Sequence, residues 1–391
     1  MVLREDVRSG SNRTVTVGVV ADPVAAPAEI AEHLAQELPR LLSERLEDDR
    51  VWHVEVHCEQ LPPSDDRRTE MMDVVGKRMR QHGWNLAACI TDYPLRSGQQ
   101  PIVADVSLER RVLVVSLPAL GGMALHRRVR GLVSQLITDM FGRDAGSKGT
   151  EKHRRRRLPW LFNRFQWVTP EHRDVDVRVL ASRGVLRLLI GMVRDNRPWR
   201  LVFGLTGPLV GAFAFSAFYL INTTVWRLAS TMELPQLLAA VLGSVAVMVG
   251  WLIVYHRLWE QTTERPANER EEAMLFNSST VLTLAIGVAC MYGALYVVNL
   301  IAAFVVVTPE VLGEYVGPGL GFGDYAVVVL LVTAAATVAG AVGSGFESEN
   351  SVREAAFSYR ERERRQALHA TQTRREQREA RGEFDVGHHA P

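Results

Sequence analysis

The spacing of apolar residues changes along this chain of 391 residues. Up to about residue 142, short runs rich in β-branched residues alternate with runs that repeat apolar residues every three or four positions. After residue 200, apolar residues become nearly continuous over stretches of about 20 residues. The pattern predicts a folded α/β domain followed by a helical region that crosses a membrane.

The first part alternates between strand-like and helix-like segments. The β-rich runs predict strands over Thr14–Ala21, Val51–Cys58, Leu86–Thr91, Ile102–Val106 and Val112–Leu117. Helical spacing predicts helices over Ala28–Arg45, over Thr69–His82 and from Gly121 to about Phe141. The order β-α-β-α-β-β-β-α implies a single α/β domain with a mixed sheet over residues 1–142.

Residues 143–200 have a different composition and are predicted to connect the two halves. A cationic run stands beside aromatic residues, a combination suited to a lipid headgroup layer: Arg154, Arg155, Arg156, Arg157 and Trp160. The alternative for this run is a solvated, flexible linker.

A short helix is predicted at the end of this connecting segment, over residues 181–196. Three basic side chains fall on one stripe of it, Arg183, Arg187 and Arg194, and an apolar side carries Leu186, Leu189 and Val193. Such a helix lies along the membrane, with its arginines on lipid headgroups, or packs on the α/β domain.

Four segments within residues 201–346 satisfy the criterion for transmembrane helices. They contain no Asp, Glu, Lys or Arg and cover Leu201–Ile221, Leu237–Tyr255, Val281–Val307 and Tyr325–Phe346. About 20 helical residues cross a hydrocarbon core of about 30 Å. The fold class predicted for the whole chain is therefore an α/β domain followed by an all-α region of four transmembrane helices.

The basic residues predict the orientation of these spans. Lys152–Arg200 contains 13 Lys and Arg, Arg257–Ala273 contains three, and the charged tail over residues 347–391 contains nine. The loops Asn222–Pro235 and Thr308–Asp324 contain one and none. The positive-inside rule then places both termini in the cytoplasm of a multi-pass inner-membrane protein.

Overall charge and cysteine content exclude several classes of partner. The net charge of +1 indicates no nucleic-acid partner. Three scattered cysteines form no disulfide framework and suit a reducing compartment. The expected partners are membrane lipid, a further copy of the chain, and a cytosolic protein or small ligand, with no cofactor.

Small and polar residues within the predicted spans indicate close helix packing. Gly207 and Gly211 follow the small-xxx-small spacing, as does Gly340 with Ala336, and Asn299 is the most polar residue near the middle of a span. The absence of an ionisable residue inside the spans disfavours ion-coupled transport. A channel or permease gated by the α/β domain remains an alternative.

Two sets of polar residues in the α/β domain are candidates for chemistry. His53, Glu55 and His57 share one face of a strand, which would suit a metal-dependent hydrolase. The two histidines are about 13 Å apart at strand spacing, so a solvated polar face is the preferred interpretation. A second set consists of aspartates at or near strand ends: Asp22, Asp92 and Asp105, which turn chemistry explains equally well.

Parts of the chain resemble two known groups of proteins. Phe276–Thr283, Gly343–Ser348 and Val352–Ala356 resemble segments of uncharacterised multi-span membrane proteins of high-GC bacteria, which implies spans but no activity. The run Leu86–Asp92, the strand Val112–Leu117 and the helix Val129–Thr138 resemble the archaemetzincin type of zincin metalloprotease.

In zincins this helix carries His-Glu-x-x-His, which binds zinc and supplies the general base. The matching positions here hold Ser134, Gln135 and Thr138, which perform neither task. The resemblance therefore implies a domain without metal or protease activity. The sequence as a whole predicts a membrane protein that tethers a non-catalytic binding or regulatory domain at the inner membrane, with the channel and the hydrolase as alternatives.

Overall fold

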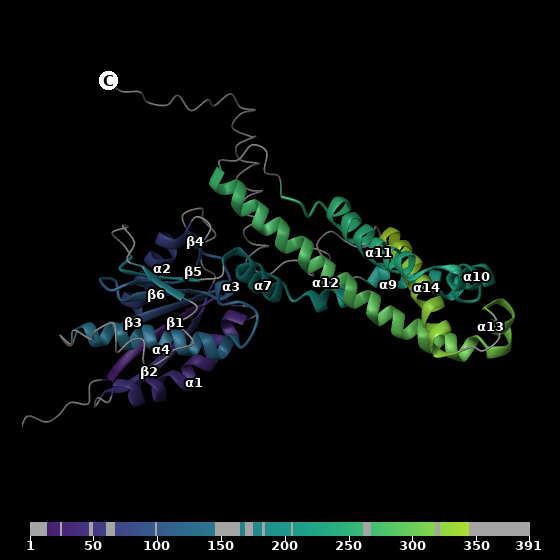
Figure 1. Cartoon of the computed structure of the whole chain (residues 1–391). Coiled ribbons are helices and arrows are strands. Elements are labelled where there is room, and N and C mark those ends of the chain that lie inside the picture. The colour runs from purple at the N-terminus through teal and green to yellow at the C-terminus, as the bar shows by residue number, and fades with distance from the viewer. Residues whose placement is uncertain are drawn as a thin grey trace, which may run out of the picture. The chain divides into compact units, whose positions relative to one another are not determined.

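The computed structural model describes residues 14–23, 26–46, 50–59, 67–97, 100–144, 165–168, 175–181, 184–204, 206–260, 267–316 and 321–343. These residues fall into two compact units (Figure 1). The α/β unit extends to Asp195, and the helical unit begins at Asn196. Arg154–Arg157, Trp160, Arg183 and the tail from residue 347 lie outside the described residues.

The α/β unit is built on one mixed sheet, as predicted. Its eight strands are β1 (Thr14–Ala21), β2 (Val51–Cys58), β3 (Leu86–Thr91), β4 (Arg96–Ser97), β5 (Gln100–Ser107), β6 (Val112–Ser116), β7 (Phe165–Val168) and β8 (Val177–Ala181). They lie in the order β2-β1-β3-β6-β5-β8-β7, with β4 paired to β5. The first four in this order are parallel, and the neighbouring pairs β6–β5, β5–β8 and β8–β7 are each antiparallel.

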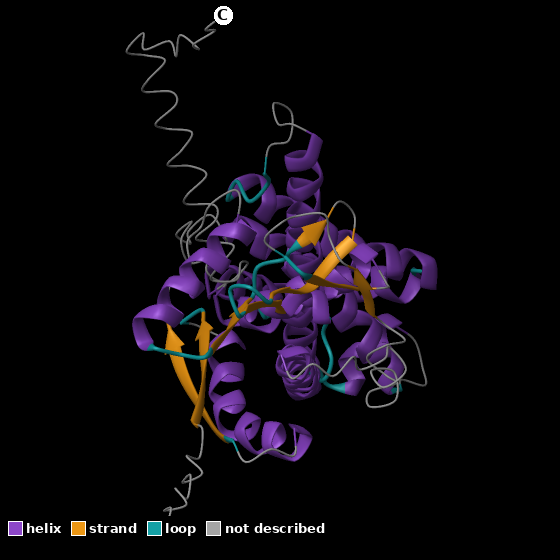
Figure 2. Cartoon of the chain, turned by 90° about the vertical axis from the view of Figure 1, so that its left-hand side faces the viewer, coloured by secondary structure: helices purple, strands orange, loops and turns teal. Residues whose placement is uncertain are grey.

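Helices cover both faces of the sheet (Figure 2). On one face, α1 (Ala26–Leu46) contacts β1, β2 and β3 and packs against α4 (Leu125–Asp144). On the other, α2 (Arg67–His82) buries Met71 and Met72 in a cluster with Val20 and Cys89. The connection from β1 to β2 and the connection from β2 to β3 run in opposite directions along the sheet. Because parallel crossover connections are right-handed, their helices α1 and α2 lie on opposite faces.

Three strands extend the sheet beyond the predicted set: the two-residue β4, and β7 and β8. β7 and β8 belong to residues 143–200, which the sequence pattern assigns to a connecting segment. Both are short, and the second residue of β8, Arg178, interrupts its apolar run. A charged residue inside a five-residue strand interrupts the apolar run by which a strand is predicted. The strand forms because Arg178 pairs with Asp105 on β5.

A glycine in β1 makes room for the largest ring in the core. A Cβ atom on Gly18 would lie 1.8 Å from Cε3 of Trp84, which is 5% exposed. Only a residue without a side chain allows the indole ring to lie flat against the strand backbone.

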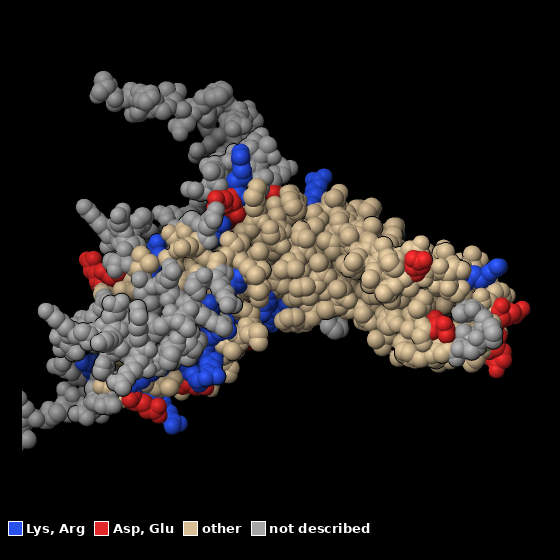
Figure 3. All heavy atoms as spheres, viewed as in Figure 1, with Lys and Arg blue, Asp and Glu red and all other residues tan. Residues whose placement is uncertain are grey.

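The helical unit begins with the 3₁₀ turn η1 (Pro198–Arg200). Its helices are α8 (Leu201–Gly204), α9 (Thr206–Leu220), α10 (Thr223–Thr231), α11 (Leu234–Tyr255), α12 (Ala267–Val306), α13 (Pro309–Val316) and α14 (Phe322–Gly343). Three of them, α11, α12 and α14, are long and apolar enough to cross a membrane, which indicates a membrane protein. On the face shown in Figure 3, a broad belt of this unit carries no charged side chain.

The first predicted span differs from a straight helix. α9 and α10 pass the span criterion only as a pair, and they are bent by 85° at a short break. Asn222 causes the break locally, because its Oδ1 accepts a hydrogen bond from the Thr224 amide (3.0 Å) and starts a new helix. Trp226 Nε1 then donates to the Leu220 carbonyl (2.8 Å), which fixes the corner. The structure therefore gives three candidate spans and one bent pair.

Candidate functional site

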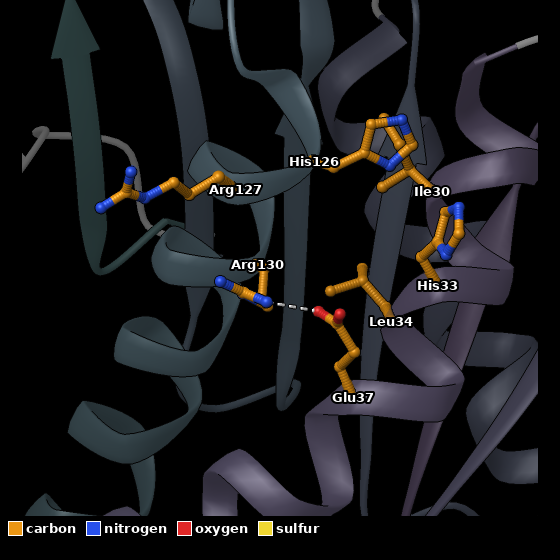
Figure 4. A pocket seen from close by; sticks show the side chains of 7 residues that line it. All are labelled: Ile30, His33, Leu34, Glu37, His126, Arg127 and Arg130. Carbon is orange, nitrogen blue, oxygen red and sulfur yellow. Dashed lines mark hydrogen bonds and ion pairs between the residues drawn. The ribbon is translucent and has the colours of Figure 1, made fainter.

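A surface pocket of about 270 Å³ opens between α1 and α4 (Figure 4). The two helices run parallel, so positions four residues apart on each face one another in register. His33 on α1 meets His126 on α4, with ring centroids 4.9 Å apart and planes nearly perpendicular (86°). One turn further along, Arg130 donates to Glu37 (2.7 Å). The pocket is therefore bordered by an imidazole pair and an ion pair.

The floor of the pocket is apolar. Ile30 and Leu34 of α1 are almost fully buried and close the space beneath the two imidazole rings. Figure 4 shows the Arg127 side chain pointing away from both histidines. An apolar floor with a few convergent polar groups is the usual composition of a small-ligand site. The sequence pattern does not predict this pocket, because its two histidines are 93 positions apart.

A second polar cluster lies where the parallel strands end. Thr91, at the end of β3, donates from its hydroxyl to Asp22 Oδ2 (3.1 Å), just after β1. The Tyr93 amide donates to the Thr91 hydroxyl (3.1 Å), and Ser116, at the end of β6, donates to the Tyr93 carbonyl (2.7 Å). On either side of β1 the chain connects through helices on opposite faces of the sheet, so the strand order reverses here. Open α/β sheets bind ligands at such switch points. Asp22 and the adjacent Asp92 are both buried here.

Asp105, the third strand-associated aspartate, lies elsewhere and is structural. Its two carboxylate oxygens accept from Nε and Nη2 of Arg178 at 2.8 and 3.0 Å. The Asp105 and Arg178 side chains are 1% and 9% exposed. This two-point ion pair joins β5 to β8 inside the unit.

The polar face of β2 packs against an aromatic cluster. Glu55 accepts a hydrogen bond from Trp84 Nε1 (2.7 Å), and the His57 ring lies 4.5 Å from that of His82, which stacks on Trp84. His53 lies 3.7 Å from Glu55 and is solvent-exposed. Among the described residues, no group of three or more His, Cys, Asp or Glu side chains is arranged to hold a metal ion.

The residues that replace the zincin motif bond within α4 and to α1. The Ser134 hydroxyl donates to the Gly131 carbonyl (3.2 Å), and that of Thr138 donates to the Ser134 carbonyl (2.7 Å). Gln135 donates to Asp139 on the same helix (2.9 Å). Arg45 of α1 reaches Gln135 from the neighbouring helix (3.5 Å). These contacts stabilise the α1–α4 layer.

The arginines of the predicted connecting helix bind backbone carbonyls. That helix is α7 (Gly184–Asn196), and it packs on the short α3 (Leu117–Leu120). Arg187 donates to the Leu120 carbonyl (3.0 Å), and Arg194 donates to the Gly121 carbonyl (3.3 Å) and pairs with Asp195. Both guanidinium groups thus satisfy carbonyls at the end of a helix.

A glycine brings α7 into direct backbone contact with α3. A Cβ atom on Gly191 would lie 2.0 Å from the Pro118 carbonyl oxygen and 2.6 Å from its Cα. Leu188 and Met192 are buried on the same face of α7. Of the predicted apolar side, Val193 is buried whereas Leu186 is 68% exposed, so the helix carries apolar residues on two faces.

The small residues of the helical unit lie where α9 meets α14. A Cβ atom on Gly340 would be 2.8 Å from the Pro208 carbonyl oxygen, and one on Gly343 would be 2.9 Å from the Gly207 carbonyl oxygen. A Cβ on Gly211 would lie 3.7 Å from Cα of Gly343. Backbones this close gain dispersion contacts that larger side chains would prevent.

Asn299 joins three helices of this unit. Its Nδ2 donates to Ser216 of α9 and to Thr333 of α14, both at 3.0 Å, and the side chain is buried. Tyr292 and Tyr296, on the same helix α12, donate to the carbonyls of Leu330 (2.9 Å) and Ala326 (3.3 Å) of α14. These polar groups hydrogen-bond one another across the helix contacts.

Comparison with known proteins supplies no family assignment. The chain matches no protein-family model, no curated protein and no solved structure.

Proposed function

We propose that this chain is a multi-pass protein of a bacterial inner membrane that holds a non-catalytic α/β binding or regulatory domain on the cytoplasmic side. In this proposal α11, α12 and α14 each cross the bilayer, and the bent α9–α10 pair supplies the fourth crossing. The α/β unit and the tail then share the cytoplasm, in agreement with the distribution of basic residues.

The helices α11, α12 and α14 carry the proposal, because each is long and apolar enough to cross a membrane. α7 leads from the α/β unit into the chain that enters the helical unit, and backbone contact at Gly191 with two arginine hydrogen bonds holds it to α3. Asn196, where the helical unit begins, donates to Thr283 of α12 within that unit (3.0 Å). α7 is thus fastened within the α/β unit up to Asp195, and the chain continues from it into the apolar helices.

The polar side chains of the α/β unit favour binding over catalysis. Asp105, Glu55, Ser134 and Thr138 make structural hydrogen bonds. The α1–α4 pocket provides the seat we assign to the ligand. Its two imidazole rings suit a polar group of the ligand, and its floor of Ile30 and Leu34 suits a hydrocarbon portion.

Photo-crosslinking from the pocket in native membranes tests this assignment. We would place benzoylphenylalanine at His126 in the full-length chain, and at Lys77 on α2 as a matched control, because Lys77 is exposed on the other face of the sheet. The proposal predicts a single adduct mass at position 126 that is absent at 77. The same products at both positions, or none at 126, would contradict it.

Two further measurements separate the proposal from its alternatives. Reconstituted protein that conducts selective flux across liposomes would replace the tether with a channel or permease. Stoichiometric zinc in the purified protein, lost on substitution of His53 or His57, would instead support the hydrolase. The proposal predicts neither result, because Tyr292, Tyr296 and Asn299 of α12 bond to neighbouring helices and Glu55 of β2 bonds to Trp84.

A further inference from the structure

The large apolar side chains exposed on the α/β unit are unevenly distributed. Its described residues include six such side chains, and four of them belong to α7 and the loop against it: Met123, Val185, Leu186 and Ile190. The other two, Val51 and Val168, are single residues on β2 and β7. Single exposed apolar residues are ordinary, whereas a contiguous group marks an interaction surface. We call this group the α7 ridge.

The geometry of α7 makes the ridge continuous. Leu186 and Ile190 are one helical turn apart, and both lie opposite the buried stripe of Leu188 and Met192. The loop before α4 joins them, because a Cβ atom on Gly122 would lie 3.0 Å from Cγ2 of Ile190. Met123, the next residue, is 78% exposed.

The length of chain limits how far the ridge lies from the first apolar segment. Leu201 follows Ile190 by eleven residues, of which the first six are helical. A rise of 1.5 Å per helical residue and at most about 3.5 Å per remaining residue bound the separation at about 27 Å. Between them, Trp199 and Arg200 are exposed, a pair typical of the headgroup layer.

We infer that the α7 ridge inserts into the headgroup–acyl boundary of the leaflet that α8 and α9 enter, so that the α/β unit docks on lipid. The inference rests on the proposed membrane location. It also gives Arg187 and Arg194 a positioning role: by holding carbonyls of the α3 end, they turn the apolar side of α7 outward. Apolar side chains at this boundary typically reach about 5–10 Å below the headgroups.

Depth-dependent fluorescence quenching of the full-length protein in nanodiscs tests the docking. Single cysteines replace Leu186, Ile190 or Val51 in a Cys58→Ser, Cys89→Ala, Cys290→Ser background, and each is labelled with bimane. The lipids carry a doxyl quencher either near the headgroup or deep in the acyl chain. We expect the ridge labels to be quenched by the shallow quencher at least about twofold more than the Val51→Cys label.

A fourth label separates failure of the docking from failure of the membrane location. Leu242 of α11 is 68% exposed in the helical unit, and a label there reports on the span itself. If Leu242→Cys is quenched by the deep quencher but the ridge labels match Val51→Cys, the docking is wrong and the spans remain. If Leu242→Cys is not quenched, the membrane location fails as well.

A second result would also overturn the docking. Ridge labels that show a blue-shifted, apolar environment but resist both quenchers would mean that a second copy or another protein covers the ridge. A Leu186→Glu change, with the bimane label at Met123→Cys, tests the same point. The added charge would remove the ridge from the lipid, so we expect quenching of the label to fall at least about twofold. Leu186 is exposed, so this change leaves the packing of α7 on α3 in place.

Discussion

Replacing Gly191 by alanine places a methyl group where the Pro118 carbonyl oxygen already lies. The added Cβ would be 2.0 Å from that oxygen and 2.6 Å from the carbonyl carbon and Cα, all of them backbone atoms that no rotamer change can move. α7 must therefore move away from α3. Gly76 of α2 provides the matched control, since its Cβ would meet only Arg80 at 3.7 Å and Val112 at 3.9 Å.

The two substitutions share a gain in helix propensity and differ in the cost of overpacking. Alanine improves helix propensity by about 0.8–1.0 kcal/mol at either position. Overpacking at Gly191 costs about 1–3 kcal/mol. If α7 lifts far enough to break the hydrogen bonds of Arg187 and Arg194, each adds about 1.5–3 kcal/mol. We expect Gly76→Ala to leave the free energy of unfolding unchanged or to raise it. The free energy of unfolding of Gly191→Ala should be at least about 1–3 kcal/mol lower than that of Gly76→Ala.

Urea titration with pulse proteolysis measures this difference. The full-length protein is held in detergent micelles, and the free energy of unfolding of the α/β unit is compared between the two variants. Equal stability of Gly191→Ala and Gly76→Ala would refute the packing of α7 on α3.

Three further substitutions test other parts of the structure. Asp105→Asn should lower the free energy of unfolding of the α/β unit by about 3–5 kcal/mol, because it leaves Arg178 buried without its charge partner; urea titration showing less than about 1 kcal/mol, typical of a solvated pair, would contradict this. Asn299→Val should destabilise the helical unit by about 0.6–2 kcal/mol in an SDS titration, and no change would mean that its two hydrogen bonds are not formed in lipid. Burial, and then the charge of Glu32, raise the pKa of the Cys58 thiol, so its alkylation should rise with pH through a midpoint above that of an ordinary thiol. Glu32→Gln should lower that midpoint, and an unmoved midpoint would contradict the contribution of Glu32.

The local sequence pattern was sufficient to predict the bounds of three parallel strands of the α/β unit. β1, β2 and β3 begin and end at the predicted residues, because each is a short apolar or alternating run with polar or turn-forming residues on both sides. β7 and β8 could not be predicted in this way. Arg178 breaks the apolar run of β8, and only its partner Asp105, 73 positions earlier, makes it a buried strand residue.

The functional surfaces depend on contacts between distant segments. His33 and Glu37, and likewise His126 and Arg130, are each spaced by four residues, which is a visible signal of a polar helix face. Nothing in the sequence says that the two faces meet. The arginine stripe of α7 was also visible, but its carbonyl partners at Leu120 and Gly121 depend on the position of α3.

The placement of the two units relative to the bilayer is the central claim, and cysteine accessibility in intact cells tests it most directly. In the cysteine-free background, single cysteines replace Lys77 of α2, Glu233 before α11 and Glu310 of α13, and a membrane-impermeant maleimide is added before or after permeabilisation. The account predicts labelling of Glu233→Cys and Glu310→Cys from outside, and labelling of Lys77→Cys only after the membrane is opened. Labelling of Lys77→Cys in intact cells, or Glu233→Cys and Glu310→Cys on opposite sides, would contradict it.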